Sequence, residues 1–130
     1  MGVRTQLTAL LPNRPGMLTR LCEALSSHKI NIVALSVVDT SDQSLVRMLC
    51  NNVREARRVM DTIGVPYGEA EVFALSMSNV PGALAKTASK LSRAKVNIDY
   101  LYASTGARTT KGVVVIGVSN LKRARKALKI

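Results

Sequence analysis

Two short motifs hold the residues of this chain that are best suited to binding a small molecule. Asn13–Leu18 (NRPGML) and Asn79–Leu84 (NVPGAL) share the pattern N-x-P-G-x-L, and each lies between an apolar run and a helical pattern. Pro suits the first position of a helix, and Gly lets a ligand approach the backbone. The amides of the Gly and of the residue after it are then free donors at the positive end of a helix dipole. The motifs therefore predict two strand-to-helix elbows that can bind a small carboxylate.

The two motifs belong to an internal repeat that spans the chain of 130 residues. At an offset of 66 residues the sequence repeats several identical pairs, and the offset then grows to 68. Among these pairs are Pro15/Pro81, Leu25/Leu91, Asn31/Asn97, Ile32/Ile98 and, at the larger offset, Asn52/Asn120. A period this long, present twice, indicates duplication of a small domain and not a solenoid. We predict two units, 1–65 and 66–130.

Apolar periodicity predicts the same order of elements, β-α-β-β-α, in both units. The first unit has predicted strands at 3–11, 30–38 and 44–50 and helices at 15–28 and 53–63. The second has strands at 71–78, 96–104 and 113–118, helices at 81–94 and 120–129, and a loop at 105–112. A split βαβ of the ferredoxin-like kind needs a fourth strand. Residues 65–71 offer a short one to the first unit, but the second unit has none left, which predicts an exposed sheet edge.

Composition excludes several classes of protein. No apolar run approaches the ~18 residues of a membrane span, and the first residues lack a signal peptide, so we expect a soluble, cytoplasmic protein with no membrane contact. The two cysteines, Cys22 and Cys50, are expected in the core and form no metal or disulfide framework. No carboxylate pair or nucleophile-base pair is present, so we expect no catalytic residue, no metal and no cofactor.

The net charge of +11 raises the alternative of nucleic-acid binding. Residues 66–130 hold 11 lysines and arginines against 3 acids, which is +8 of the total. Ferredoxin-like sheets that bind RNA stack bases on aromatic side chains, and here only Phe73, Tyr100 and Tyr102 lie on predicted strands. We therefore favour a solvated basic face and expect no nucleic-acid partner.

The repeated unit resembles the ACT domain, a regulatory module of amino-acid metabolism. The resemblance depends on the N-x-P-G-x-L elbow and on the Asn-Ile pair fifteen residues after its Pro-Gly, and it covers the whole chain twice. It implies an α+β fold of two ferredoxin-like units whose antiparallel sheets pair side by side, with helices on one face. It also implies a free amino acid bound between units, a homodimer, and an enzyme or transporter that the protein regulates.

The resemblance also implies which residues bind. The elbow of one unit would work with the Asn of the second strand of another, so Asn13 pairs with Asn97 and Asn79 with Asn31, while Asp99 meets the ligand's amino group. Where some members have a His two residues before the elbow Asn, this chain has Leu11 and Met77, which favours a less polar ligand or none. The expected ligand-binding residues are Asn13, Arg14, Pro15, Gly16, Met17, Leu18, Asn31, Ile32, Asn79, Val80, Pro81, Gly82, Ala83, Leu84, Asn97, Ile98 and Asp99.

Structural roles explain the same residues equally simply. Asn13 and Asn79 could cap the helices that follow. Asn31 and Asn97 could form the turn before a strand, since Asn is disfavoured within strands. The glycine-flanked segment 106–112 carries a Lys and hydroxyls but lacks the order of a phosphate-binding loop, so we expect a hairpin loop. A duplicated unit that serves only for dimerisation also fits the sequence.

Overall fold

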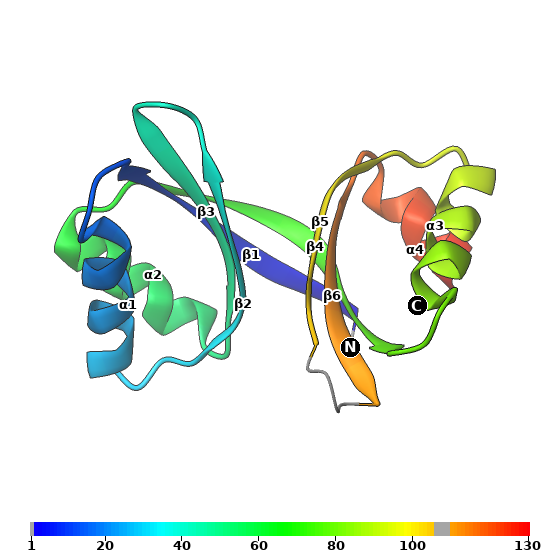
Figure 1. The fold of residues 1–130 in the computed structure, drawn as a ribbon, viewed down its shortest axis with the longest axis horizontal. Helices are drawn as coiled ribbons and strands as arrows, with labels where there is room; N and C mark the ends of the chain where they lie inside the picture. The colour runs from blue at the N-terminus through cyan, green and yellow to red at the C-terminus, as the bar shows by residue number, and fades with distance from the viewer. Residues whose placement is uncertain (1, 106–109) are drawn as a thin grey trace. The chain divides into compact units, whose positions relative to one another are not determined.

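The structure is a computed structural model that describes residues 2–105 and 110–130. The chain divides into two compact units. Figure 1 colours the chain from blue at the N-terminus to red at the C-terminus. The first unit is Thr5–Ala70, and the second unit is Glu71–Ile130 together with Met1–Arg4. Part of the predicted loop 105–112, namely 106–109, lies outside the described residues.

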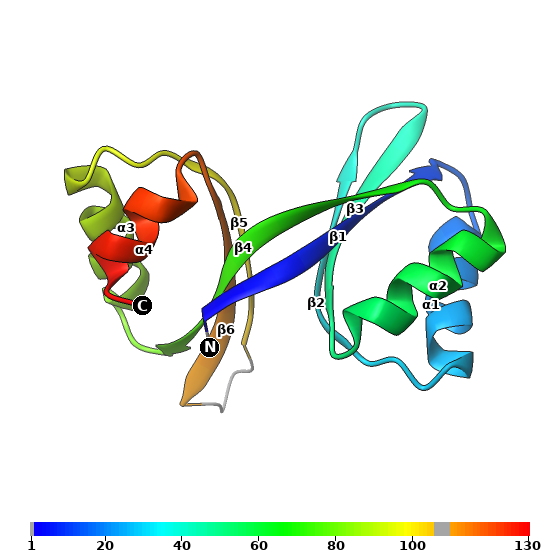
Figure 2. The ribbon, with the colours of Figure 1, turned by 180° about the vertical axis from the view of Figure 1, so that it is seen from behind.

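The first unit contains two helices on one face of its strands, as Figures 1 and 2 both show. Its elements are β1 (Gly2–Pro12), α1 (Met17–Ser27), β2 (Ile32–Asp39), β3 (Gln43–Cys50), α2 (Val53–Ile63) and the start of β4 (Tyr67–Ser78). β3 pairs with both β1 and β2 in antiparallel register, so that Met48 faces Leu7 on one side and Leu35 on the other. The predicted β-α-β-β-α order is confirmed.

The second unit repeats this arrangement. It contains the rest of β4, then α3 (Ala83–Arg93), β5 (Ile98–Ser104), β6 (Lys111–Val118) and α4 (Leu121–Leu128), again with both helices on one face of the strands (Figure 2). β6 pairs with β4 and β5, both antiparallel. The order of hydrogen-bonded strands is β2-β3-β1 in the first unit and β4-β6-β5 in the second. The α+β, ferredoxin-like fold predicted from the repeat is confirmed.

The fourth strand of each unit is one end of a long strand, and the rest of that long strand belongs to the other unit. Residues 67–70 of β4 belong to the first unit, as predicted, and the amide of Leu10 donates to the carbonyl oxygen of Pro66 just before them, at 2.9 Å. The second unit was expected to lack a fourth strand, and this expectation was wrong. The start of β1 belongs to it, and Val3 packs against its core. The error arose because the whole strand 3–11 had been assigned to the first unit.

An ion pair fastens the short fourth strand of the first unit to its helix layer. The guanidinium of Arg57 on α2 donates from Nε to Glu69 Oε2 at 2.9 Å and from Nη2 to Oε1 at 2.6 Å. These hydrogen bonds hold the pKa of Glu69 below its usual range. The bidentate geometry fixes where the strand leaves the turn after α2, although an exposed pair of this kind contributes little to stability.

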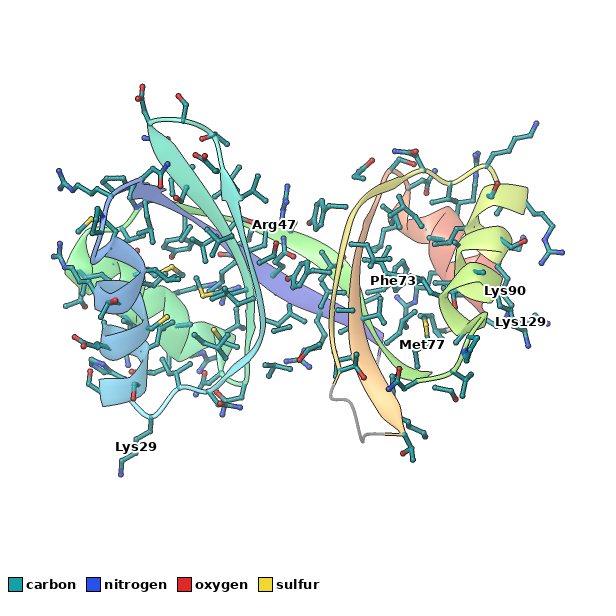
Figure 3. All side chains as sticks on the ribbon, viewed as in Figure 1. Lys29, Arg47, Phe73, Met77, Lys90 and Lys129 are labelled. Atoms are coloured by element: carbon teal, nitrogen blue, oxygen red, sulfur yellow. The ribbon has the colours of Figure 1, made fainter. Side chains whose placement is uncertain are left out.

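Aliphatic side chains fill the core of each unit between strands and helices. In the first unit the core includes Leu7, Ala9, Leu11, Leu21, Leu25, Val46, Met48, Val59 and Met60. In the second it includes Phe73, Leu91, Val96, Ile116 and Ala124. Figure 3 shows Phe73 between the strands and helices of the second unit, whereas Lys90 and Lys129 lie on the outer side of its helices. The exposed position of these two lysines fits a solvated basic face.

The two cysteines differ in burial, so the expectation that both lie in the core is confirmed for Cys50 only. Cys50 is 5% exposed, and its burial raises the pKa of the thiol to about 11. Cys22 is only half-buried on α1, and burial raises its pKa as well. Among residues 2–105 and 110–130, no three side chains of the metal-binding types gather into a possible ion site. In that same part of the chain, no helix has the length and apolar character needed to cross a bilayer.

Candidate ligand site at the two elbows

The two elbows have the same backbone conformation. β1 ends at Pro12 and α1 begins at Met17, with Gly16 between them as the N-cap at φ +88° and ψ −12°. In the second unit Gly82 takes the same place before α3, at φ +88° and ψ −10°. A left-handed φ of this size is costly for residues with a Cβ, which explains why both motifs have Gly here.

The helices begin two residues later than the sequence predicted. Pro15 and Pro81 lie before the N-cap and not at the first helical position. The amide of Met17 donates to the carbonyl oxygen of Arg14 at 3.4 Å, and that of Ala83 donates to Val80 at 3.3 Å. The expectation of free amides was therefore wrong for Met17 and Ala83, whereas the amides of Gly16 and Gly82 have no backbone acceptor within the described residues.

The free donors lie one residue further along each helix. The first helical hydrogen bond is that from Arg20 N to the oxygen of Gly16, at 3.0 Å. Within the described residues, the amides of Leu18 and Thr19 in α1 have no acceptor, and those of Leu84 and Ala85 in α3 also have none. The first turns of these helices also contain no acidic residue. Each elbow thus presents two backbone donors of the first helical turn, in addition to the amide of its Gly, to an incoming acceptor.

The other two helices of the molecule start differently. Asn52 caps α2 by accepting from the amide of Glu55 at 3.1 Å, and Asn120 caps α4 by accepting from the amide of Arg123 at 3.0 Å. α1 and α3 have no side-chain cap. Each unit therefore has one helix start closed by Asn and one left open at the elbow.

Asn13 does not cap α1. Its Nδ2 donates to Asp39 Oδ1 at 2.8 Å and to the backbone oxygen of Ser41 at 3.0 Å, and Ser44 Oγ donates to its Oδ1 at 3.3 Å. The side chain thus ties the elbow to the β2–β3 hairpin. Asn79 does not cap α3 either. The cap interpretation of both residues was wrong, and Asn13 has a structural role that the sequence analysis missed.

Asn31 and Asn97 occupy the turns that precede β2 and β5. The amide of Asn31 donates to Asn51 Oδ1 at 3.0 Å, and the amide of Asn51 returns a bond to the Asn31 carbonyl oxygen at 3.0 Å. Asn97 and Ser119 exchange the corresponding bonds at 3.1 and 3.0 Å. The interpretation of these residues as a turn before a strand is confirmed. Asn97 Nδ2 also donates to Asp99 Oδ1 at 3.0 Å, and both side chains are exposed.

Within one unit, the predicted binding residues fall into two separate groups. Asn13 contacts Asp39 at the end of β2, whereas Asn31 lies just before Ile32, where β2 begins. At ~3.3 Å per residue, the eight residues of β2 hold these groups roughly 23 Å apart. Ile32 and Ile98 pack at the edges of their unit's core and help to fix the turns. The pairings of Asn13 with Asn97 and of Asn79 with Asn31 stay predictions.

A cavity of about 280 Å³ opens beside the first elbow, entirely within the first unit. Its walls are the end of β1, the elbow, the start of α1 and the turn after α2. The apolar lining comes from Leu10, Leu11, Met17, Leu21, Ile63 and Val65, and the long polar side chains are Arg14, Arg20 and Gln43. Of the predicted elbow residues, Arg14 and Met17 line this cavity. Arg20 and Gln43 were missed, although Arg20 lies one turn after Met17 on the same predicted helix.

The cavity beside the second elbow is smaller. It has a volume of about 200 Å³, and its walls include the end of β4, the elbow and described residues of the β5–β6 hairpin. Asn79, Val80, Ala83 and Leu84, which are among the predicted ligand-binding residues, line it together with Met77, Ala103 and Val114 among others. Among the residues that the structure describes, no lysine, arginine, aspartate or glutamate contributes to its wall. The two elbows therefore share a backbone but border different cavities.

Comparisons with known proteins agree with this fold. A crystal structure of a Bacteroides thetaiotaomicron protein superposes with a TM-score of 0.91 at 31% identity, covering 98% of this chain and 87% of that one. The ligand-free regulatory subunit of aspartate kinase from Thermus thermophilus gives 0.70 at 16% identity, covering 99% and 96%. The corresponding subunit from Thermus flavus gives 0.66 at 18% identity, covering 99% and 95%. No curated protein matches the sequence.

The family comparison covers the chain from end to end. The family model described as an ACT domain pair matches residues 1–130, so it includes both elbows, both turns before the edge strands and all four helices. This match agrees with the resemblance on which the sequence analysis relied. The chain belongs to the family of ACT domain pairs.

Proposed function

We propose that the protein is a regulatory module that binds a free amino acid at its elbows and has no catalytic activity of its own. The ligand's carboxylate accepts hydrogen bonds from the open amides at the start of α1 or α3. Binding changes how the protein associates with a second copy or with the enzyme or transporter that it regulates.

The observation that carries this proposal is the difference between the helix starts. The molecule closes α2 and α4 with Asn side chains but leaves α1 and α3 open, and the open starts are those next to a cavity and a left-handed Gly. Unsatisfied amides at the positive end of a helix dipole favour a negatively charged acceptor. A carboxylate would accept hydrogen bonds from these amides, as the Asn side chains do at the starts of α2 and α4.

The fold comparison supports the regulatory part of the proposal. The Thermus subunits that share this fold are regulatory subunits of aspartate kinase, so chains of this size and fold do regulate an enzyme in other organisms. For a ligand to act as a signal, it must bind one conformational or assembly state better than another. The expected homodimer can be bound to the regulated partner or free of it. These are the two states between which the ligand would discriminate.

A thermal-shift screen against the twenty amino acids tests the proposal. A ligand at 100 times its dissociation constant adds about 2.7 kcal/mol to the free energy of unfolding, which gives a clear rise in Tm. We expect at least one amino acid to raise Tm. The double variant Thr19→Glu with Ala85→Glu places a carboxylate within the first turn of each open helix, and this variant should lose the response.

Ser89→Glu is the matched control for the blocked variant. Ser89 lies one turn beyond Ala85 on the exposed side of α3, so it receives the same new charge away from the helix start. The control should keep the amino-acid response. No response to any amino acid in the unmodified protein would refute the proposal, and a response that survives the blocked variant would move the ligand away from the elbows.

A further inference from the structure

Two positively charged side chains, those of Arg14 and Arg20, line the cavity beside the first elbow. In the part of the chain that the structure describes, no aspartate or glutamate lines it. Within the described residues, neither Arg14 nor Arg20 forms an ion pair with a carboxylate, whereas Arg57 and Arg58 do. Two cations without a counter-charge at the edge of a cavity attract an anion, and a guanidinium is well suited to bind a carboxylate.

The rest of the cavity suits a short hydrocarbon chain. Leu11 and Leu21 are buried core residues that form its floor, and Met17, Ile63 and Val65 add half-buried apolar walls. A volume of about 280 Å³ lies just below the ~300–1,000 Å³ of pockets that hold drug-sized ligands. The space therefore suits a branched aliphatic chain or a small ring better than a nucleotide.

The charge of the lining decides between a zwitterion and a simple anion. An amino acid would bring its ammonium group close to two guanidiniums, and no acidic side chain in the wall can pair with it. Like charges a few ångströms apart repel by about 1 kcal/mol in water and by more in a partly dry cavity. A ligand with the carboxylate but without the ammonium avoids this cost.

We propose that the cavity of the first unit binds a small apolar carboxylic acid that lacks an amino group, with its carboxylate held by Arg14 and Arg20. The inference rests on the proposed function, because the cavity shares Arg14 and Met17 with the first elbow, and it changes the ligand class there from a zwitterion to a net anion. The second elbow has Val80 in place of Arg14, and its cavity has no charged side chain among the described residues that line it. We therefore expect one such anion per chain, bound at the first elbow.

Isothermal titration calorimetry with three matched probes tests this inference. Isocaproate is leucine without its amino group, leucine is the zwitterion, and isocaproamide has the same chain without a charge. We expect isocaproate to bind at one site per chain, about fivefold to tenfold more tightly than leucine, because one unfavourable ammonium is worth about 1 kcal/mol. Isocaproamide should bind still more weakly.

Two variants test the assigned arginines. Arg14→Val installs the residue that the repeat has at the second elbow, and Arg20→Ala removes the other charge. Each should weaken isocaproate binding by about tenfold and leave the weak isocaproamide binding unchanged, since a charge-assisted hydrogen bond is worth about 1.5 kcal/mol or more. Arg54→Ala removes an exposed arginine from α2, outside the cavity, and should not change the affinity. Unchanged Tm values without ligand confirm that the variants fold.

Several results would overturn the inference. Leucine binding more tightly than isocaproate would do so, as would isocaproate affinity that is unchanged in Arg14→Val. Displacement of isocaproate by an equal concentration of inorganic phosphate would show a simple anion site with no role for the apolar walls. An amino-acid response that is lost in Thr19→Glu but kept in Arg14→Val would leave the proposed function standing while this inference fails. Isocaproate binding without any amino-acid response would support this inference, while the proposed function in amino-acid binding would fail.

Discussion

The two kinds of helix start in this molecule differ in whether a side chain accepts a hydrogen bond from the first-turn amides. α2 and α4 begin with an Asn whose side chain accepts an amide hydrogen, whereas α1 and α3 begin with a left-handed Gly that has no side chain to offer. All four starts would be expected to need an acceptor, because the first amides of any helix have no partner within it. The difference shows that the open starts are a feature of the elbows and not of helices in this chain generally.

The largest expected effect comes from adding a side chain at the left-handed position. Gly16→Ala and Gly82→Ala should each lower the free energy of unfolding by about 1–2 kcal/mol, because φ is +88° at both residues. No heavy atom lies within 4 Å of the added Cβ at either site, so the cost is one of backbone conformation alone. Urea denaturation measures it.

Gly68→Ala is the matched control for this prediction. Gly68 also has open space around an added Cβ, but it lies in β4 and is absent from the residues with positive φ. Its substitution should change the free energy of unfolding by less than about 0.5 kcal/mol. Equal destabilisation by all three substitutions would contradict the role assigned to the elbow glycines.

Removing the caps of the closed helices should have a somewhat smaller effect. Asn52→Ala and Asn120→Ala each leave one first-turn amide unsatisfied, and each should destabilise the protein by about 1 kcal/mol. Asn52→Asp keeps an acceptor at the same place and should be nearly neutral. If Asn52→Ala is also neutral, then the closed and open starts do not differ in energy, and the comparison loses its basis.

The smallest expected effect comes from supplying an acidic group to an open helix. Thr19→Glu should stabilise the protein without ligand by about 0.3–1 kcal/mol, because a carboxylate in the first turn interacts favourably with the helix dipole. The gain should be present at neutral pH and should disappear as the pH falls below about 4, where the carboxylate is protonated. Thr19→Gln separates this electrostatic effect from helix propensity and should show no such pH dependence.

The sequence predicted the fold well because the duplication supplied two copies of every signal. Leu18, Leu21, Cys22 and Leu25 recur at helical spacing, and the predicted helix 53–63 has the same bounds as α2. The fourth strand of the second unit could not be predicted in this way. A strand of eleven residues has no internal signal that its first residues, around Val3, belong to another core than Leu7 and Leu11.

The site could be predicted only in part. The N-x-P-G-x-L motif identified the elbows, but it did not show that the left-handed Gly is the N-cap or that Asn13 bonds to the β2–β3 hairpin, since both depend on tertiary geometry. The cavity depends on residues from distant parts of the chain, such as Gln43 and Val65, which no local pattern links to Arg14. The motif thus locates a candidate site, and packing decides the shape and charge of the cavity beside it.

The most direct test of the account follows the backbone amides by two-dimensional nitrogen–proton NMR during a titration with an amino acid that raises Tm. The account predicts that the largest shifts fall on the amides of Leu18 and Thr19 at the open start of α1, while those of Arg54 and Glu55 at the capped start of α2 stay in place. Shifts that leave Leu18 and Thr19 unmoved, or that move the capped start equally, would contradict it.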